Sequence, residues 1–207
     1  MKRLTLFVAL GEDEQHAIAQ ALRLAGLSAD EPARVIRRSL DARKGRPLGH
    51  QLEVATGPVG DEPQAEVARV RAGLRVVVVG SGPAGTFAAR HLVAAGAHVT
   101  LVERGREVQP RRHDLASLTR GRLVEDSNYC FGEGGAGTFS DGKLYTRVKD
   151  RDAVRDVLRT LVDHGGPDEI LVDSRPHIGS NRLPKILVSM REALIAAGVQ
   201  YVWDDAV

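Results

Sequence analysis

Cysteine, aromatic residues and long apolar runs are all scarce in this chain of 207 residues. A single cysteine excludes an internal disulfide and a cysteine-based zinc site, and it favours a reducing compartment. No apolar stretch approaches the roughly 20 residues that a membrane span requires. The formal net charge of +2 indicates no polyanionic partner by itself. G-x-S-x-G and Walker sequences are missing, and the histidines lack ligand spacing, so no metal site is expected.

The N-terminus carries two basic residues before a short apolar run, Leu4–Leu10. Acidic residues follow directly, without a cleavage site of small residues, so this run indicates a strand and not a signal peptide. We therefore expect a cytoplasmic protein that does not associate with a membrane.

Four valines, Val76–Val79, lead directly into a G-x-G-x-x-G sequence. Helix-forming sequence follows as far as Gly96, and a second apolar run ends at an acid about 20 residues after the glycines. The order strand, glycine turn, helix, strand and acid is typical of a dinucleotide-binding unit. The cofactor-binding residues predicted in this unit are Gly80, Ser81, Gly82, Pro83, Ala84, Gly85, Glu103 and Arg104.

Each part of this unit has its own physical role. Gly80 permits the tight turn, Gly82 lets a pyrophosphate approach the backbone, and Gly85 lets the helix pack closely. Pro83 is tolerated at the first helical position, and the free N–H groups of that helix face the phosphates. Glu103 is expected to accept hydrogen bonds from ribose hydroxyls and to repel a 2′-phosphate, which leaves FAD and NAD as alternatives.

A second glycine cluster occupies the segment 131–144. Five glycines between Gly132 and Gly142 expose backbone N–H groups and permit positive φ, so the loop can wrap closely around a polar ligand. Phe131 and Phe139 flank most of the cluster, which favours an anchored loop over a flexible one.

The segment from Gly132 to Leu144 resembles the signature of uncharacterised FAD-dependent dehydrogenases, also described as NAD(FAD)-utilizing dehydrogenases, in the glutathione-reductase-like flavoprotein superfamily. Pro176–Gly179 with Leu183, and Arg37–Lys44, are similar to two further segments of that family. The resemblance implies FAD at the first glycine turn, with the second loop against the pyrophosphate, ribityl chain and flavin. It also implies an adenine contact after the last strand. The matching cofactor-binding residues are Gly134, Gly135, Ala136, Gly137, Thr138, Ser140, Gly142, Lys143 and Val207.

The resemblance also implies a function. We expect a flavin-dependent oxidoreductase that transfers hydride through bound FAD to an unknown small-molecule substrate, with NAD(P)H as a candidate electron donor. The alternatives are a non-catalytic nucleotide-binding module and an NAD-binding protein without flavin. The sequence indicates neither the substrate nor the oligomeric state.

The predicted fold class is α/β. A small α/β domain, 1–56, precedes a linker at 57–73 and a Rossmann-like FAD-binding doubly wound domain at 74–207. An insertion that starts a substrate domain is expected at about 144–183. Because family members look much longer, we expect this chain to be an N-terminal portion with an incomplete FAD domain, inactive by itself.

Periodicity predicts the individual elements. Strands are expected at Leu4–Leu10, Gln51–Val54 and Val199–Trp203, and helices at Asp13–Ala25, Pro32–Leu40, Asp114–Thr119, Arg151–Val162 and Pro184–Ala197.

Three further features have two interpretations each. His177 is the candidate catalytic residue, as an acid, base or anion holder near the flavin, but a loop histidine with local hydrogen bonds is the alternative. Six basic residues between Arg34 and Arg46 suit an anion-binding face or a solvated flank. No aromatics are interleaved among them, so nucleic acid is not expected. Cys130 is expected to be a buried small residue and not a redox thiol.

Overall fold

The computed structural model describes residues 2–58, 68–179 and 181–205. The chain forms two compact units, each with its own three-stranded sheet. Unit 1 comprises Met1–Gln64, Leu144–Arg147 and Asp168–Pro176, and unit 2 comprises Ala65–Lys143, Val148–Pro167 and His177–Val207. Residues 59–67 of the predicted linker, and the predicted adenine contact Val207, lie outside the described residues.

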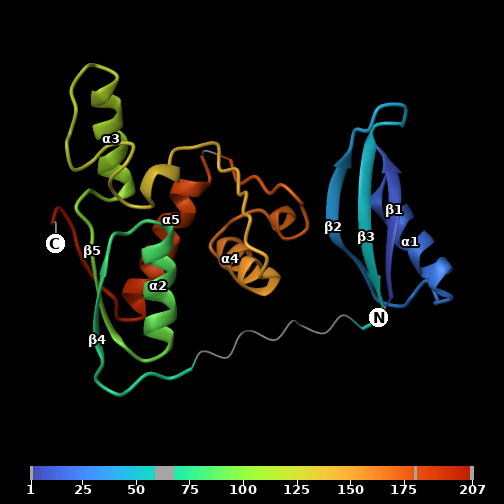
Figure 1. Ribbon diagram of the computed structural model, residues 1–207, viewed down its shortest axis with the longest axis horizontal. Coiled ribbons are helices and arrows are strands. Elements are labelled where there is room, and N and C mark those ends of the chain that lie inside the picture. Colours follow the sequence, from blue (N-terminus) through green and yellow to red (C-terminus); the bar gives the residue numbers. More distant parts are fainter. Residues whose placement is uncertain (1, 59–67, 180, 206–207) are drawn as a thin grey trace. The chain divides into compact units, whose positions relative to one another are not determined.

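The sheet of unit 1 is antiparallel, with the strand order β1-β3-β2. Its elements are β1 (Lys2–Ala9), α1 (Glu14–Ala25), β2 (Ala33–Asp41) and β3 (Gly49–Thr56). Helix α1 lies against the sheet (Figure 1), and its small residues Ala17 and Ala21 pack on the buried Leu52 and Val54. The Asp13 side chain caps this helix at its N-terminus. The two strands and the helix predicted at 4–10, 51–54 and 13–25 are thus confirmed.

The short helix predicted over Pro32–Leu40 is wrong, because these residues form β2. The strand pairs with β3 along one edge. On its other edge the N–H of Arg38 donates to the carbonyl of Val172 at 2.7 Å, and the N–H of Ser174 donates to the carbonyl of Arg38 at 2.8 Å. Hydrogen bonds to neighbouring chain on both edges stabilise an extended backbone here, and they outweigh the weak local preference of these residues for a helix.

Two arginines of β2 and the following turn form ion pairs within unit 1. The guanidinium of Arg38 contacts Asp173 at 2.7 Å and Glu14 at 3.1 Å, which ties the strand edge to α1 and gives Arg38 a structural role. Arg43 pairs with the nearby Asp41.

The sheet of unit 2 is parallel, with the strand order β4-β5-β6. Its strands are β4 (Arg75–Val79), β5 (His98–Val102) and β6 (Gln200–Val202). Helix α2 (Pro83–Ala94) connects β4 to β5, and α5 (Leu183–Ala196) precedes β6; Figure 1 shows both helices together beside the sheet. Leu101 lies at the centre of their shared core and has no exposed surface. The predicted α/β class, with a Rossmann-like parallel sheet and helices, is confirmed.

The remaining helices are α3 (Val108–Leu118), η1 (Gly135–Gly137), α4 (Arg151–Asp163) and η2 (Asp168–Leu171). The helices predicted at 151–162 and 184–197, and the strand at 199–203, are confirmed within a few residues. The helix predicted at 114–119 starts earlier, at Val108. Asp150 caps α4, because its carboxylate accepts from the N–H groups of Asp152 and Ala153. No helix in the described ranges has the length and apolar character needed to cross a membrane.

The core of unit 2 predicts a difference between two truncations in its sheet. Leu101→Ala removes a side chain that is fully buried, so we expect a loss of about 2–5 kcal/mol in the free energy of unfolding. Val77 is 60% exposed on β4, so Val77→Ala is expected to cost less than about 1 kcal/mol. Urea unfolding followed by circular dichroism compares the two, and equal losses would contradict this core.

Candidate functional site

The G-x-G-x-x-G residues form the connection from β4 to α2. Gly80 has a φ of +92°, which favours glycine, and Pro83 is the first residue of the helix. A Cβ at Gly85 would overlap the carbonyl oxygen of Gly80, so glycine is required there for the helix to approach the turn. A Cβ at Gly82 would meet nothing within 4 Å, so the space beside Gly82 is open to a ligand.

Glu103 follows β5 and is almost completely buried. Its Oε2 accepts from the N–H of Ser81 at 2.7 Å and from the Ser81 hydroxyl at 2.8 Å. Its Oε1 accepts from the N–H of Gly105 at 2.9 Å and from the N–H of Gly132 at 3.1 Å. Burial alone would raise the pKa of Glu103, but these hydrogen bonds stabilise the carboxylate and hold its pKa below the usual value.

The predicted role of Glu103, accepting hydrogen bonds from a ribose, has to be compared with the hydrogen bonds that its carboxylate already accepts from the protein. The carboxylate has about four acceptor positions, and protein groups supply four donors to them. The residue thus joins the first glycine turn to the second loop, a role that the sequence did not indicate. The contact of Glu103 with a ribose stays a prediction.

The second glycine loop lies directly against the first. The N–H of Gly134 donates to the carbonyl of Ser81 at 2.9 Å. A Cβ at Gly135 would lie 3.6 Å from Gly82 and from Pro83, which places the two loops in van der Waals contact, and the φ of +68° at Gly135 favours glycine there. Residues separated by about 50 positions are therefore brought together at the N-terminus of α2, as the two-loop prediction requires.

A buried arginine of α3, Arg111, holds the second loop from inside. Its guanidinium donates to one side-chain hydroxyl, that of Thr138, at 3.0 Å. It donates otherwise to main-chain carbonyls, those of Asn128, Tyr129, Gly132, Glu133 and Gly135, at 2.6–3.2 Å. Burial lowers the pKa of Arg111. Five carbonyls of the loop therefore point towards the guanidinium of Arg111.

A second buried acid, Glu133, connects the loop to two helices. Its Oε2 accepts from the N–H of Val108 at 2.7 Å, where α3 begins, and from the guanidinium of Arg191 on α5 at 3.0 Å. Burial raises the pKa of Glu133, and these two donors only partly offset that effect. The N-terminus of α3 thus takes its cap from a residue of the glycine loop.

The other predicted site residues lie in the two loops and next to them, and some of them have partners within the protein. Arg104 pairs with Asp126 and lies over the ring of Phe131, 4.2 Å from its centroid. Ala84, Ala136, Gly137 and Ser140 are exposed, while Thr138 and Gly142 are buried. The hydroxyl of Ser140 donates to the carbonyl of Gly137 at 2.7 Å.

His177 lies opposite Lys143 in an isolated antiparallel bridge. Directly opposite residues of such a pair project from the same face, so the two side chains start from the same side of the bridge. Lys143 is also paired with Asp141 at 2.8 Å, and its exposed position leaves it accessible to solvent. His177 is exposed as well. Its catalytic role stays a prediction.

Cys130 is exposed, so the prediction that it is a buried small residue is wrong. The neighbouring Asn128 explains this position, because its side-chain oxygen accepts from the N–H of Cys130 and turns the chain outwards. No group of three or more histidine, cysteine or acidic residues in the described ranges could hold a metal ion.

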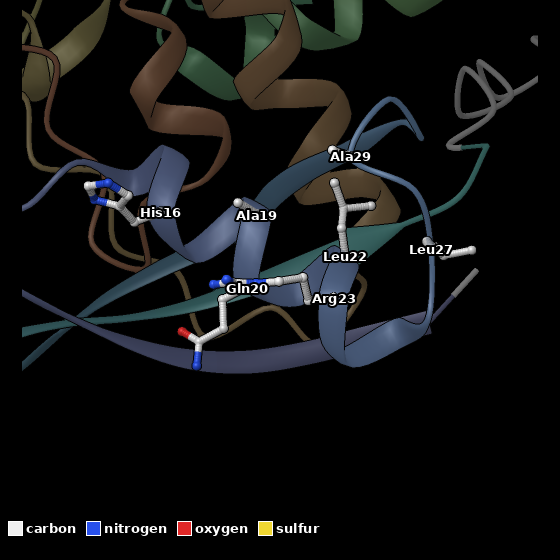
Figure 2. A pocket seen from close by; sticks show the side chains of 7 residues that line it. All are labelled: His16, Ala19, Gln20, Leu22, Arg23, Leu27 and Ala29. Atoms are coloured by element: carbon white, nitrogen blue, oxygen red, sulfur yellow. The ribbon is translucent and has the colours of Figure 1, made fainter.

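A hollow in unit 1 contains none of the residues discussed above. Figure 2 shows its lining side chains on α1 and the loop that follows: His16, Ala19, Gln20, Leu22, Arg23, Leu27 and Ala29. These side chains present no group of acids, nucleophiles or metal ligands, so the glycine loops remain the candidate site.

Sequence reasoning missed Arg111 and Glu133. Arg111 stands among several arginines between 104 and 122, and neither its type nor its neighbours distinguish it. A signal was present in the spacing, because Val108, Arg111 and Leu115 lie three and four residues apart and share the buried face of α3. An arginine on an apolar stripe indicates a buried ion with dedicated acceptors.

The comparisons with known proteins agree with this geometry. Residues 74–121 match the family described as pyridine nucleotide-disulphide oxidoreductase. An uncharacterized protein of Clostridium beijerinckii is 36% identical to this chain over 184 residues, which cover 79% of the chain and 34% of that relative. The chain thus spans about a third of the length of this curated relative. The family match supports a flavin- or NAD(P)-dependent oxidoreductase module in unit 2.

The buried carboxylate predicts a pH-dependent stability. The pKa of Glu103 is lower in the folded chain, so its contribution is complete above the unfolded value of about 4.3 and is lost as the pH falls through the folded value. We expect Glu103→Gln to cost about 2–3 kcal/mol at pH 7. The difference from the wild type should shrink below about pH 4.

Urea unfolding at pH 7 and pH 3.5 measures this effect. The matched control is Glu125→Gln, which removes the same charge from an exposed position after α3. A wild-type stability advantage over Glu103→Gln that stays constant across this pH range would show that the charge of Glu103 is not involved.

Proposed function

We propose that the chain carries the FAD-binding part of a flavin-dependent oxidoreductase, in which both glycine loops hold the pyrophosphate. Bound FAD would supply the redox chemistry by accepting and donating hydride. The residues of this chain would bind the cofactor, orient it and limit the access of water to it. The substrate is a small molecule that the sequence does not specify.

One observation carries the proposal: backbone N–H groups without a protein acceptor gather where the two loops meet. They belong to Ala84 and Gly85 at the start of α2 and to Ala136 in η1. Among the described residues, these three groups have no protein acceptor. Two loops in contact, with free donors on both, suit a ligand with two adjacent phosphates.

The surrounding charges agree with that ligand. The positive dipole end of α2 faces the open space beside Gly82, which favours an anion there. The negative charge of Glu103 is stabilised by its own donors, which enclose the carboxylate so that it does not confront the phosphates directly. It would still disfavour a further phosphate on the adenosine ribose, so NADP is a poorer candidate than FAD or NAD.

FAD is preferred over NAD because of the second loop. A dinucleotide unit needs only the first turn for its pyrophosphate, whereas this chain adds a second loop at the same point, held there by Arg111 and by a hydrogen bond from Gly134 to Ser81. The similarity of that loop to FAD-dependent dehydrogenases and the oxidoreductase match over 74–121 support this choice. His177, next to Lys143, is the residue we propose for holding or moving a proton at its imidazole.

Gly82→Val tests the proposal. The structure leaves room for the new side chain, so the variant should fold, but the valine would fill the space proposed for the pyrophosphate. We expect FAD affinity to fall at least about a hundredfold, equivalent to the loss of two or more phosphate contacts. Titration calorimetry with FAD, together with flavin absorbance after gel filtration, measures this.

The matched control is Ala88→Val, which adds the same side chain at an exposed position of α2 and should leave FAD affinity unchanged. Equal FAD affinity of Gly82→Val and wild type would overturn the assignment. NADH binding without FAD binding would favour the NAD alternative, and binding without any electron transfer would favour a non-catalytic module.

A further inference from the structure

Arg111 binds the backbone of the second loop in an unusual way. Its side chain is 1% exposed, and its hydrogen bonds reach five main-chain carbonyls and one hydroxyl within the segment 128–138. No carboxylate among the described residues lies within ion-pair distance of it. A buried cation with neutral acceptors is costly unless its geometry is fully used, so the donors of this guanidinium define the fold of the loop.

The direction of these hydrogen bonds decides which side of the loop is free. The carbonyl of Gly135 points towards Arg111, so the N–H of the same planar peptide group, which belongs to the exposed Ala136, points to the opposite side. That side meets the start of α2, because Gly135 lies beside Gly82. The inward cation therefore leaves a donor that faces outwards.

A second contact makes this arrangement specific. The peptide groups of Gly132 are held on both sides, with its N–H on Glu103 and its carbonyl on Arg111. Gly132 has a φ of +109°, and a Cβ there would collide with the side chain of Arg111. The segment thus has one backbone conformation that satisfies both ions.

We propose that Arg111 is a positioning residue for the dinucleotide: it holds the second glycine loop so that the free N–H group of Ala136 faces the pyrophosphate. This inference rests on the proposed function. Arg111 itself does not touch the ligand, since its donors all bond to protein.

If Arg111 acts through the directions of its N–H donors and not through its charge alone, two substitutions at this position should both weaken FAD binding. Arg111→Met keeps much of the volume but removes every donor. Arg111→Lys keeps the charge but offers three donors from one point, which cannot reach carbonyls spread over the loop. We expect both variants to bind FAD about tenfold more weakly or worse, a loss equivalent to one or more hydrogen bonds.

Two measurements on the full chain test this, namely FAD titration and hydrogen exchange of the 128–138 peptide. The peptide that covers β5 serves as the reference for global unfolding. We expect faster exchange at 128–138 with unchanged protection of β5, which a general loss of stability would not produce. The matched control is Arg120→Met, an exposed arginine just after the same helix, which should match the wild type in both measurements.

The outcomes separate this inference from the proposed function. Wild-type FAD affinity in Arg111→Met would overturn the positioning role, and wild-type affinity in Arg111→Lys would show that charge alone suffices. If the wild type bound no FAD, the proposed function would fail. Hydrogen exchange in Arg111→Met would then test the role of Arg111 in the loop: faster exchange at 128–138 with unchanged protection of β5 supports that role, and unchanged exchange at 128–138 contradicts it.

Discussion

The arrangement of both glycine loops depends on one buried negative charge, the carboxylate of Glu103. A charge in that position must be surrounded by donors, and its four hydrogen bonds come from the first turn, the residues after β5 and the second loop. Satisfying this carboxylate therefore brings three separate pieces of chain to one point at the end of the sheet. The site that we propose for the pyrophosphate is a consequence of that convergence, because the turn and the loop meet there.

Arg111 complements this acid from the other side of the loop. The two ions do not pair directly; they bond to opposite ends of the same backbone segment at Gly132. Peptide dipoles between an anion and a cation are oriented by both, so the two ions together fix the backbone that leads into the short helix η1. Glu133 extends the same principle, because its carboxylate ties the loop to α3 and to Arg191 of α5.

Features of unit 2 that depend on neighbouring residues were predictable from the sequence. The strand, turn and helix around Gly80 follow from local pattern, and Asp150 signalled the start of α4 correctly. Features that depend on distant partners were not predictable. Residues 33–41 form strand β2 because they pair with β3 and with a segment near Asp173. Arg111 bonds to a loop about 20 residues further along the chain, and no local pattern indicates that contact.

The pairing of Arg38 with Asp173 also has a consequence for the order of folding. These residues are 135 positions apart, so their contact closes a long loop and gains nothing until the intervening chain is ordered. The β4–α2–β5 segment, in contrast, closes over a few tens of residues. Contacts of low sequence separation form first, so the nucleotide-binding crossover should fold early, and the edge of β2 should acquire its last hydrogen bonds late.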